Sequence, residues 1–496
     1  MNVLVQIRVL VVLVIGGLLF ANISIPTTNA TTIIVPDDYA DIQTAINRAS
    51  PGDVITIRAG VYGGFKVSKS LVIIGESNQS VIIKGSVEIS ANNVRLGSLK
   101  ILVDESVGST YALAIIGNNT VLTGIVVESF KDGVQLGSMS QSVSGTVIEY
   151  SKVIAGRIGI YGIYEDLGVF YSEVIVSSGN ALIGGHYLDV EYSIITGDTA
   201  VSSGLFSSGW IIKNNHIIGS STGIYLDGTY HTVSNNVING NTGIIVKGKG
   251  ITIENNTISA SETGVLLTSH NNVVVGNKIS AAKRAIDLNG NGNLIINNTL
   301  MGGRGVHASG AYGNTIAFNL INMTGSVGVY FSKYTSDNLV YGNTFWYCYN
   351  YEAADESGGN QWYLENETHK LGNYWSYNKA LDNNGDGITD SPYPIPTTTG
   401  LEILDKYPLA QPLVSPYQTP SPTTSPPETT TPTLPPYITG TTTTSTSTQT
   451  TTPSPGFSTD TTTQGVGGEV GSLYVIGSVV LVVFILIVAF ILLRRR

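Results

Sequence analysis

Residues 236–258 read NVINGNTGIIVKGKGITIENNTI, and the Asn-x-Ile triplet at their start returns at Asn256, twenty residues later. The same triplet, with Ile, Leu or Phe in its third position, recurs along the chain. Its asparagines are Asn215, Asn236, Asn256, Asn277, Asn298, Asn319 and Asn343, at intervals of 21, 20, 21, 21, 21 and 24 residues. A period of this length indicates a repeat architecture in which each unit stacks on the next.

A second column keeps step with the asparagines and consists of Gly or Ala followed by an aliphatic residue, as at Gly243 and Gly264. Each repeat therefore holds short strands separated by turns, and no pattern of helical length. Such repeats predict an all-β fold, a right-handed parallel β-helix solenoid with residues 54–350 as its repeat region. We expect about fourteen coils between Val54 and Cys348.

Both ends of a stack of strands need a cap, because unpaired strand edges promote aggregation. In residues 31–53, the segment 38–50 carries apolar residues at helical spacing, and Pro51-Gly52 follows it, which predicts an N-terminal helical cap. Residues 351–410 are rich in aromatic side chains and are interpreted as a C-terminal cap, with a binding role for these aromatics as the alternative.

The two ends of the chain carry targeting signals. Residues 1–30 resemble a secretory signal peptide, with an uncleaved anchor as the alternative. Residues 411–471 form a Thr/Ser/Pro-rich stretch that predicts a disordered, glycosylated stalk. The uncharged residues 473–493 predict a transmembrane helix, and the basic residues 494–496 predict a short cytoplasmic tail. We therefore expect a single-pass protein of the cell membrane with an extracellular N-terminal ectodomain.

The composition excludes some function classes. Charged residues make up 12% of the chain and the formal net charge is −10, so nucleic acid is not expected as a partner. The single cysteine, Cys348, cannot form an intramolecular disulfide. Stability must therefore come from the stacking of coils.

Several motifs together resemble those of NosD-like, pectin-lyase-like β-helix surface proteins, chiefly archaeal ones. They are IIVP (33–36), IQTAI (42–46), SPGD (50–53), GVY (60–62), LVIIG (71–75), the Asn-x-Ile repeats, GNYWS (372–376) and DNNGDGITDSPY (382–393). The resemblance implies the β-helix fold. It implies little about activity, because that group mixes carbohydrate-binding modules, sugar hydrolases and a copper-delivery accessory protein.

Metal sites were sought among oxygen and soft ligands. Asp382, Asn384, Asp386, the Ile388 carbonyl and Asp390 stand at alternate positions and predict a Ca²⁺ loop. An acidic turn without an ion is the alternative, because the loop lacks the glutamate that closes an EF-hand. One Cys, four Met and six scattered His offer no soft-ligand cluster for copper, and no organic cofactor is predicted.

Sugar-cleaving sites were sought next. The Asn-Thr-Asp, Asp-Asp and Gly-His-Gly elements of enzymes resembling polygalacturonases are missing in that form. The 21-residue period places Glu165 beside His186, and Asp287 beside His307, so these four are weak catalytic candidates. Charge pairing on a solvated face explains isolated acids beside a cation or imidazole more simply.

Outward columns supply the ligand-binding candidates. Tyr225 and Tyr330 are expected in one column with Asp287 and His307, and Asp227 beside Lys247 in the next column. Tyr150, Tyr171 and Tyr192 also share a 21-residue register, which favours either stacking or a glycan-binding face.

These observations favour a surface-anchored β-helix that binds glycans or builds the cell envelope, with glycans or envelope components as partners and self-association possible in principle. The first alternative is an extracellular polysaccharide hydrolase or lyase. The second is a metal accessory protein of the NosD kind that handles copper.

Overall fold

The computed structural model describes residues 30–138 and 140–413. The predicted signal peptide, the predicted transmembrane helix and tail, and nearly all of the predicted stalk lie outside these residues. Within the described ranges, no helix combines the length and the apolar character needed to cross a membrane.

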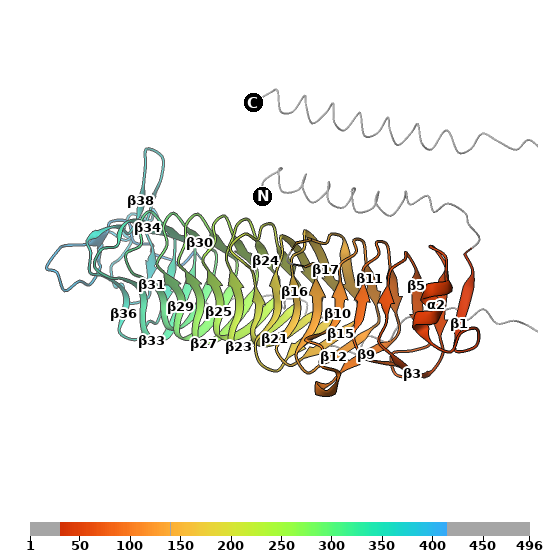
Figure 1. Ribbon diagram of the computed structural model, residues 1–496. Helices are drawn as coiled ribbons and strands as arrows, with labels where there is room; N and C mark the ends of the chain where they lie inside the picture. Colours follow the sequence, from red (N-terminus) through yellow and green to blue (C-terminus); the bar gives the residue numbers. More distant parts are fainter. Residues whose placement is uncertain (1–29, 139, 414–496) are drawn as a thin grey trace, which may run out of the picture. The chain divides into compact units, whose positions relative to one another are not determined.

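The described chain is a right-handed parallel β-solenoid, as the repeat predicts (Figure 1). Three strands make up a typical coil: β11 (Val121–Thr123), β12 (Val126–Ser129) and β13 (Asp132–Leu136). Each pairs in parallel with its counterpart in the next coil. One side of every coil contributes to a sixteen-stranded sheet, and the other two sides join in a twenty-two-stranded sheet.

The sixteen-stranded sheet contains β11 and fifteen further strands. These are β1 (Thr32–Val35), β2 (Val54–Ile57), β5 (Val72–Gly75), β8 (Arg95–Gly97), β14 (Thr146–Glu149), β17 (Asp166–Phe170), β20 (Tyr187–Glu191), β22 (Ile211–Lys213), β24 (Thr232–Ser234), β26 (Thr252–Glu254), β28 (Val273–Val275), β30 (Leu294–Ile296), β32 (Thr315–Ala317), β34 (Ser336–Tyr341) and β37 (Gly359–Gln361).

The twenty-two-stranded sheet contains short strands at its ends and long ones in its later coils, where one strand runs through the corner between two sides. The short strands besides β12 and β13 are β3 (Gly60–Gly63), β4 (Lys66–Val67), β6 (Val81–Lys84), β7 (Val87–Ile89), β9 (Lys100–Val103), β10 (Tyr111–Ile115), β15 (Lys152–Ala155), β16 (Ile158–Gly162), β18 (Glu173–Val176), β19 (Asn180–Gly184), β35 (Thr344–Trp346), β36 (Tyr351–Asp355) and β40 (Tyr374–Trp375). The long strands are β21 (Ile194–Ser202), β23 (His216–Leu226), β25 (Val237–Val246), β27 (Thr257–Leu267), β29 (Lys278–Leu288), β31 (Thr299–Ala308) and β33 (Leu320–Phe331).

The number of coils differs from the expected fourteen. The sixteen strands of one sheet correspond to about sixteen turns, because β1 and β37 also join it from the ranges expected to serve as caps. The period is also longer in the early coils: Val121 pairs with Arg95 and with Val147, each 26 residues away. Extra residues at the turns lengthen a coil without disturbing its strands.

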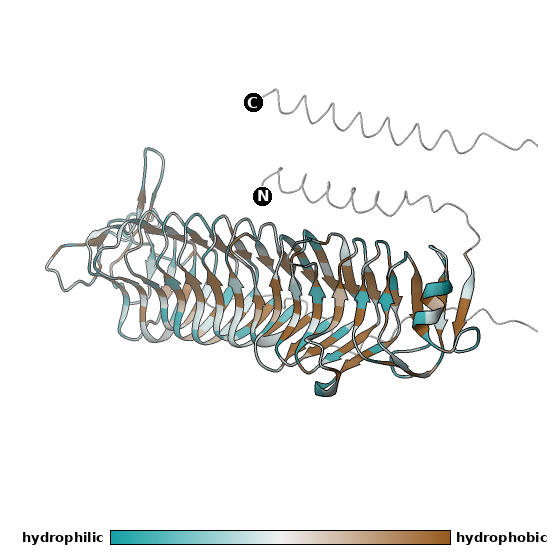
Figure 2. Ribbon diagram, viewed as in Figure 1, coloured by the Kyte–Doolittle hydropathy of each residue, from teal (hydrophilic) through white to brown (hydrophobic). Residues whose placement is uncertain are grey.

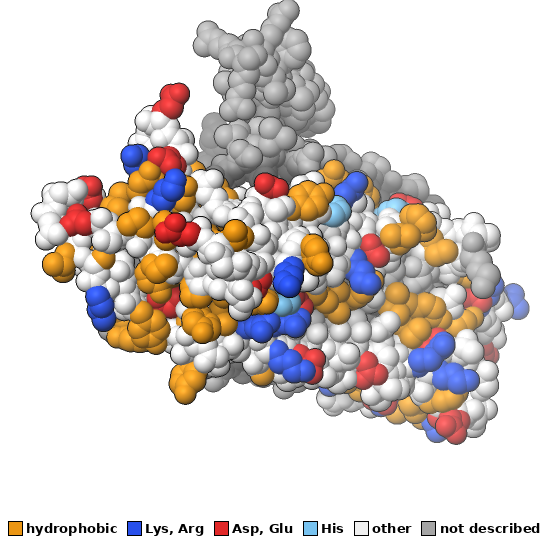
Figure 3. Space-filling model, turned by 90° about the vertical axis from the view of Figure 1, so that its left-hand side faces the viewer, with side chains coloured by type: hydrophobic (Ala, Val, Ile, Leu, Met, Phe, Trp, Pro, Cys, Tyr) orange, Lys and Arg blue, Asp and Glu red, His pale blue; other side chains and the backbone are white. Residues whose placement is uncertain are grey.

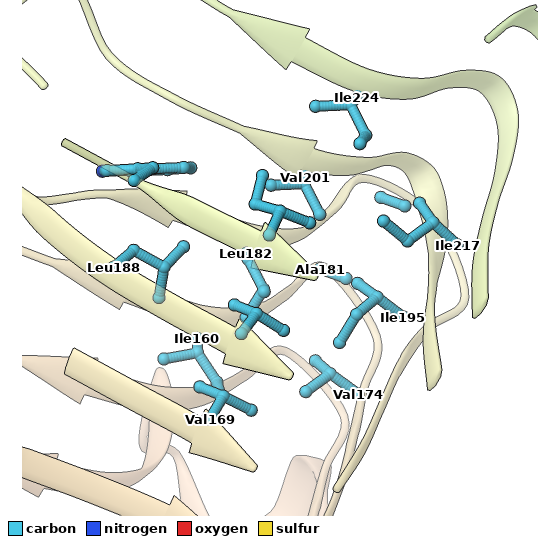
Figure 4. Close-up of a cluster of buried hydrophobic side chains, with 14 of the residues drawn as sticks. Ile160, Val169, Val174, Ala181, Leu182, Leu188, Ile195, Val201, Ile217 and Ile224 are labelled. Atoms are coloured by element: carbon cyan, nitrogen blue, oxygen red, sulfur yellow. The ribbon is translucent and has the colours of Figure 1, made fainter. Parts of the chain in front are cut away.

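The core lies inside the coils, where side chains of like position stack along the solenoid. Val174, Ile195 and Ile217 form one such stack, and Leu182 lies beside it (Figure 4). All four are at most 1% exposed. Hydropathy accordingly alternates along the strands (Figure 2). Burying one side chain of this size contributes roughly 1.5–3 kcal/mol, so the repeated stacks are the main source of stability.

The asparagines of the repeat form a continuous hydrogen-bonded ladder. Asn277 is typical: its Oδ1 accepts from the backbone N–H of Asn256 at 2.9 Å, and its Nδ2 donates to the carbonyl of Ile253 at 2.9 Å and to Oδ1 of Asn298 at 3.0 Å. Ser151, Ser172 and Ser193 occupy the same position upstream, as predicted. The ladder therefore satisfies turn backbone groups that strand pairing leaves unpaired.

A second amide ladder runs along another turn and was not predicted. Its members are Asn272, Asn293, Asn314, Asn338 and Asn360. Their first three intervals, 21, 21 and 24 residues, match those of the first ladder, so the signal was present in the sequence.

The N-terminal cap is a helix, as predicted, although it is shorter than segment 38–50. Helix α2 spans Ile42–Arg48, and Asp41 at its N-cap accepts a hydrogen bond from the backbone N–H of Thr44 at 2.8 Å. At the other end, Trp362 and Trp375 are buried among neighbouring aromatic rings. Asp405 ends the first ladder by accepting from Asn373 and Trp375.

Candidate functional site

The predicted outward column on the twenty-two-stranded sheet is present. Asp287 of β29, His307 of β31 and Tyr330 of β33 are direct register partners. The His307 and Tyr330 rings stack in parallel with centroids 5.6 Å apart. Tyr225 belongs to the same column, but two aliphatic residues of the intervening coils separate it from Asp287.

Asp287 is held by two cationic or imidazole partners. Its Oδ2 lies 2.5 Å from Nη1 of Arg284, and its Oδ1 lies 2.9 Å from Nδ1 of His307. Burial on its own raises the pKa of Asp287, but the hydrogen bonds from His307 and Arg284 outweigh it and bring the pKa below the ordinary value. The carboxylate therefore stays ionised and paired, which suits a structural role better than proton transfer.

The other predicted pairs are neighbours by register without being bonded. Tyr187 N–H donates to the Glu165 carbonyl, which sets Glu165 and His186 side by side in successive coils. Within the described residues their side chains share no hydrogen bond or ion pair; Glu165 Oε1 accepts instead from Ser142. The sequence therefore located neighbours on the stack, but not a catalytic pair.

Asp227 and Lys247 are likewise adjacent but do not pair with each other. Asp227 Oδ1 accepts from the backbone N–H of Gly228 at 2.8 Å. Lys247 Nζ lies 5.9 Å from the centroid of the Tyr225 ring. A cation–π contact therefore replaces the expected charge pairing.

The predicted calcium loop closes through its own hydrogen bonds. The carboxylate of Asp382 accepts from the backbone N–H groups of Gly385 and Gly387, and Asp386 accepts from that of Ile388. In the described residues, no group of three or more His, Cys, Asp or Glu side chains is arranged to hold a metal ion. Calcium binding by Asp382, Asn384, Asp386, Ile388 and Asp390 stays a prediction.

The tyrosine column is present as a stack. Ring centroids lie 5.2 Å apart between Tyr150 and Tyr171, and 5.0 Å apart between Tyr171 and Tyr192. The rings are nearly parallel, so their faces cover one another. Because a sugar ring needs an uncovered aromatic face, the stack favours the structural reading over the glycan-binding one.

A cluster that the sequence did not indicate lies on the outward face of the sixteen-stranded sheet. In β20, Leu188 and Val190 point into the core, so Tyr187, Asp189 and Glu191 point outward. Register places them beside the outward residues of β17 and β22. We call this group the Asp189 patch; it comprises Asp166, Phe170, Tyr187, Asp189, Glu191, Ile211 and Lys213.

Asp189 has unusual surroundings for a carboxylate. Its register neighbours are Gly168 and Ile211, and the Phe170 ring lies so close to Gly168 that a Cβ there would be 2.4 Å from a ring carbon. Oδ1 of Asp189 is buried and has no hydrogen-bond partner. Burial raises the pKa of Asp189 to about 7, and the negative charge of Glu191 adds to the effect.

The neighbours of Asp189 add a second protonatable carboxyl and exposed aromatic surface. Burial also raises the pKa of Asp166. Tyr187 is 56% exposed, and Tyr230, two coils further in the same column, is 69% exposed. Phe206, in the loop that leads into β22, is 81% exposed. Paired carboxyls beside exposed rings are the usual makings of a sugar site.

The sequence hid this patch for a geometric reason. Asp166 and Asp189 are 23 residues apart, so they fall out of step with the 21-residue period. They meet because β17 and β20 are in register at Asp166 and Tyr187, and Asp189 follows on the same face. No short motif marks such a pair.

Solved structures with a similar arrangement include several polysaccharide-related proteins. An alginate lyase, AlyGC of family PL6, aligns over 69% of this chain with 13% identity and a TM-score of 0.44, and the chain spans only 55% of that lyase. A tailspike of E. coli bacteriophage HK620 aligns over 63% of this chain and 73% of its own, with 13% identity and a TM-score of 0.43. A DFA-IIIase from Arthrobacter chlorophenolicus A6 covers 63% and 94%, with 12% identity and a TM-score of 0.38.

These likenesses say nothing of what this chain does. A search of curated protein sequences found no match. A protein-family comparison did: the family described as periplasmic copper-binding protein (NosD) matches residues 116–380, which are 265 of the 496 residues. With more than half of its length matched, and with the Asn-x-Ile coils inside the match, the chain belongs to the NosD family.

Proposed function

We propose that this chain is a polysaccharide-binding protein displayed on the outside of the cell membrane, and that the sugar lies across the Asp189 patch. The buried, unpartnered Oδ1 of Asp189 carries the proposal, because a carboxyl in such surroundings is a costly feature that folding alone does not require. Tyr187 and Phe206 supply exposed rings for the apolar faces of sugars, and the carboxyls accept bonds from sugar hydroxyls.

A glycan array probed with the full chain tests the binding role. We expect retention of one class of polysaccharide, and at least about tenfold weaker binding by Tyr187→Ala, because the variant removes an aromatic platform. Tyr312→Ala is the matched control, since Tyr312 is 55% exposed and lies outside the patch. Equal binding by the two variants, or no retained glycan, would contradict the proposal.

Hydrolysis of the bound polysaccharide is the second candidate, and the pKa of about 7 at Asp189 favours it. A carboxyl that keeps its proton near neutral pH can protonate the glycosidic oxygen as the C–O bond breaks. Asp166 or Glu191, when ionised, would take a proton from the attacking water. The sequence showed isolated acids, whereas the fold brings these three together.

Release of reducing ends from the polysaccharides retained on the array separates the two candidates. A hydrolase is expected to release them, and Asp189→Asn is expected to abolish the release while leaving binding within about threefold, because the amide keeps the shape of the carboxyl. If the wild-type chain binds but releases nothing, binding alone stands.

The family description raises copper binding as a third role, but the residues present do not fit it. His231, for example, is buried and bonded to backbone groups, and Cys348 is fully buried with its Sγ 3.9 Å from the Ile321 carbonyl. The described residues hold no cluster of metal ligands. We therefore do not propose a copper role for this chain.

A further inference from the structure

A second surface, five coils from the Asp189 patch and on the other sheet, centres on Arg304. Its guanidinium carbon lies 4.8 Å from the centroid of the Tyr330 ring, so the side chain rests on an aromatic support. His307 stacks on the same ring. Figure 3 shows basic side chains gathered beside a histidine on this part of the surface.

Arg304 differs from Arg284, its register neighbour in the preceding coil, in having no acidic partner. Arg284 is neutralised by Asp287, whose second oxygen is taken by His307. Within the described residues, no carboxylate lies within ion-pair distance of Arg304 or of the nearby Lys333. Two positive charges are thus held next to each other without a counter-charge from the chain.

A groove of about 470 Å³ opens beside these cations. It is lined by Tyr330, Tyr334, Lys333, the hydroxyl groups of three Ser and Thr residues, and Glu356. Glu356 is occupied, because it accepts from the backbone N–H and the hydroxyl of Thr398. Tyr334 is 90% exposed, which leaves its ring free to contact a ligand.

The column beyond Tyr330 explains why the groove is open. The register partner of Tyr330 in the next coil is Ala354, whose methyl group does not cover the ring. The groove therefore combines an aromatic floor, hydroxyl groups and uncompensated positive charge. Hydroxyl groups and rings suit a sugar, and the positive charge requires an anionic one.

We infer that Arg304, Lys333 and the rings of Tyr330 and Tyr334 form a second polysaccharide site, which binds chains whose sugars carry carboxylate groups, as uronic acids do. A guanidinium held flat on a ring presents its N–H edge as a fork, which matches a planar carboxylate. The inference rests on the proposed polysaccharide-binding role but uses none of the residues of the Asp189 patch.

Titration of the full chain with oligogalacturonate, with its methyl-esterified form and with dextran sulfate tests the site. We expect saturable binding of oligogalacturonate that weakens with salt, and at least about tenfold weaker binding of the neutral methyl ester. Tighter binding of dextran sulfate than of oligogalacturonate would overturn the carboxylate assignment.

Variants then locate the binding. Arg304→Gln is expected to weaken oligogalacturonate binding by about tenfold or more, and Arg304→Lys to keep part of it, because lysine retains the charge but not the fork. Arg95→Gln, at an exposed position on the other sheet, is the matched control and should bind as the wild type does. Unchanged binding by Arg304→Gln, with its circular dichroism intact, would overturn the site.

The two proposals fail separately. Tyr187→Ala is expected to leave oligogalacturonate binding unchanged, since it lies on the other sheet. If Tyr187→Ala abolishes oligogalacturonate binding and Arg304→Gln does not, the carboxylated sugar lies at the Asp189 patch and the Arg304 site is wrong.

Discussion

Asp189 and Asp287 are both carboxyl groups on outward faces of the solenoid, yet their surroundings move their pKa values in opposite directions. Asp189 is buried without a bonded cation, which raises its pKa, whereas the bonds from His307 and Arg284 lower that of Asp287. The two residues look alike in the sequence. Only the neighbours on adjacent coils distinguish a protonatable group from a structural ion pair.

Replacing Asp189 should stabilise the protein at alkaline pH. A carboxyl whose folded pKa is about 7 binds its proton more tightly in the folded state, so its contribution to stability falls as pH rises from about 4 through 7. Asp189→Asn removes this cost and should add about 2 kcal/mol at pH 8 and little at pH 4. Urea unfolding at both pH values measures the effect.

The control for that measurement is Asp337→Asn, at an exposed position with a positive φ of 58° that asparagine tolerates. It should change the stability by less than about 0.5 kcal/mol at either pH. Equal stability of wild type and Asp189→Asn at pH 8 would show that the carboxyl is not desolvated as described.

His231 should make the fold sensitive to acid. Its Nδ1 accepts from the backbone N–H of Trp210 at 3.1 Å, and its Nε2 lies 2.6 Å from the carbonyl of Asp227, so the neutral ring fits. Burial lowers the pKa of His231 to about 4. Its contribution to stability is therefore complete above about pH 6.5 and is lost as pH falls toward 4.

The position of His231 suggests the matching variant. Trp210 donates to it as the turn N–H groups of later coils donate to the second amide ladder, so Asn can replace the histidine as acceptor. His231→Asn should keep the melting temperature at pH 7.5 and lose less of it than the wild type at pH 4.5. The same acid shift in both proteins would contradict this role.

At the scale of the element, the asparagine ladder acts as one structure because each amide serves two coils. Asn298 accepts from the backbone N–H of Asn277 and donates to the carbonyl of Val274. Removing one amide leaves buried backbone groups unsatisfied on both sides. The cost therefore exceeds that of a single hydrogen bond.

Asn298→Ala should destabilise the protein by about 2–4 kcal/mol, which chemical unfolding followed by circular dichroism would detect. Asn297→Gly is the control next to it: Asn297 is exposed at φ 55°, which glycine also adopts, so little change is expected. A loss below about 0.5 kcal/mol in Asn298→Ala would mean that water replaces the ladder bonds.

At the scale of the whole molecule, the repeat makes one long core with two caps. The β-solenoid and the NosD family are established, whereas the signal peptide, stalk and transmembrane helix lie outside the described residues and stay predictions. Self-association also stays a prediction. The two proposed sugar sites lie on different sheets, so one polysaccharide need not fill both.

Membrane attachment is the prediction that belongs to this scale. The full chain should sediment with membranes and resist alkaline carbonate, and deletion of residues 473–493 should release it, because no other stretch near the C-terminus is long and uncharged enough to span a bilayer. Protease added to intact cells should cleave the ectodomain. Release of the full chain by carbonate would argue against the anchor.

The sequence by itself determined the all-β solenoid, the register of its asparagines, the N-terminal cap and the column of Asp287, His307 and Tyr330. A period of about 21 residues is enough for these, since residues one period apart must stack. Only the tertiary structure decided which side chains meet where coils differ in length. Asp166 and Asp189 meet at a spacing of 23 residues, because an added turn residue shifts the sequence but leaves strand pairing intact. Burial at that point then sets their chemistry.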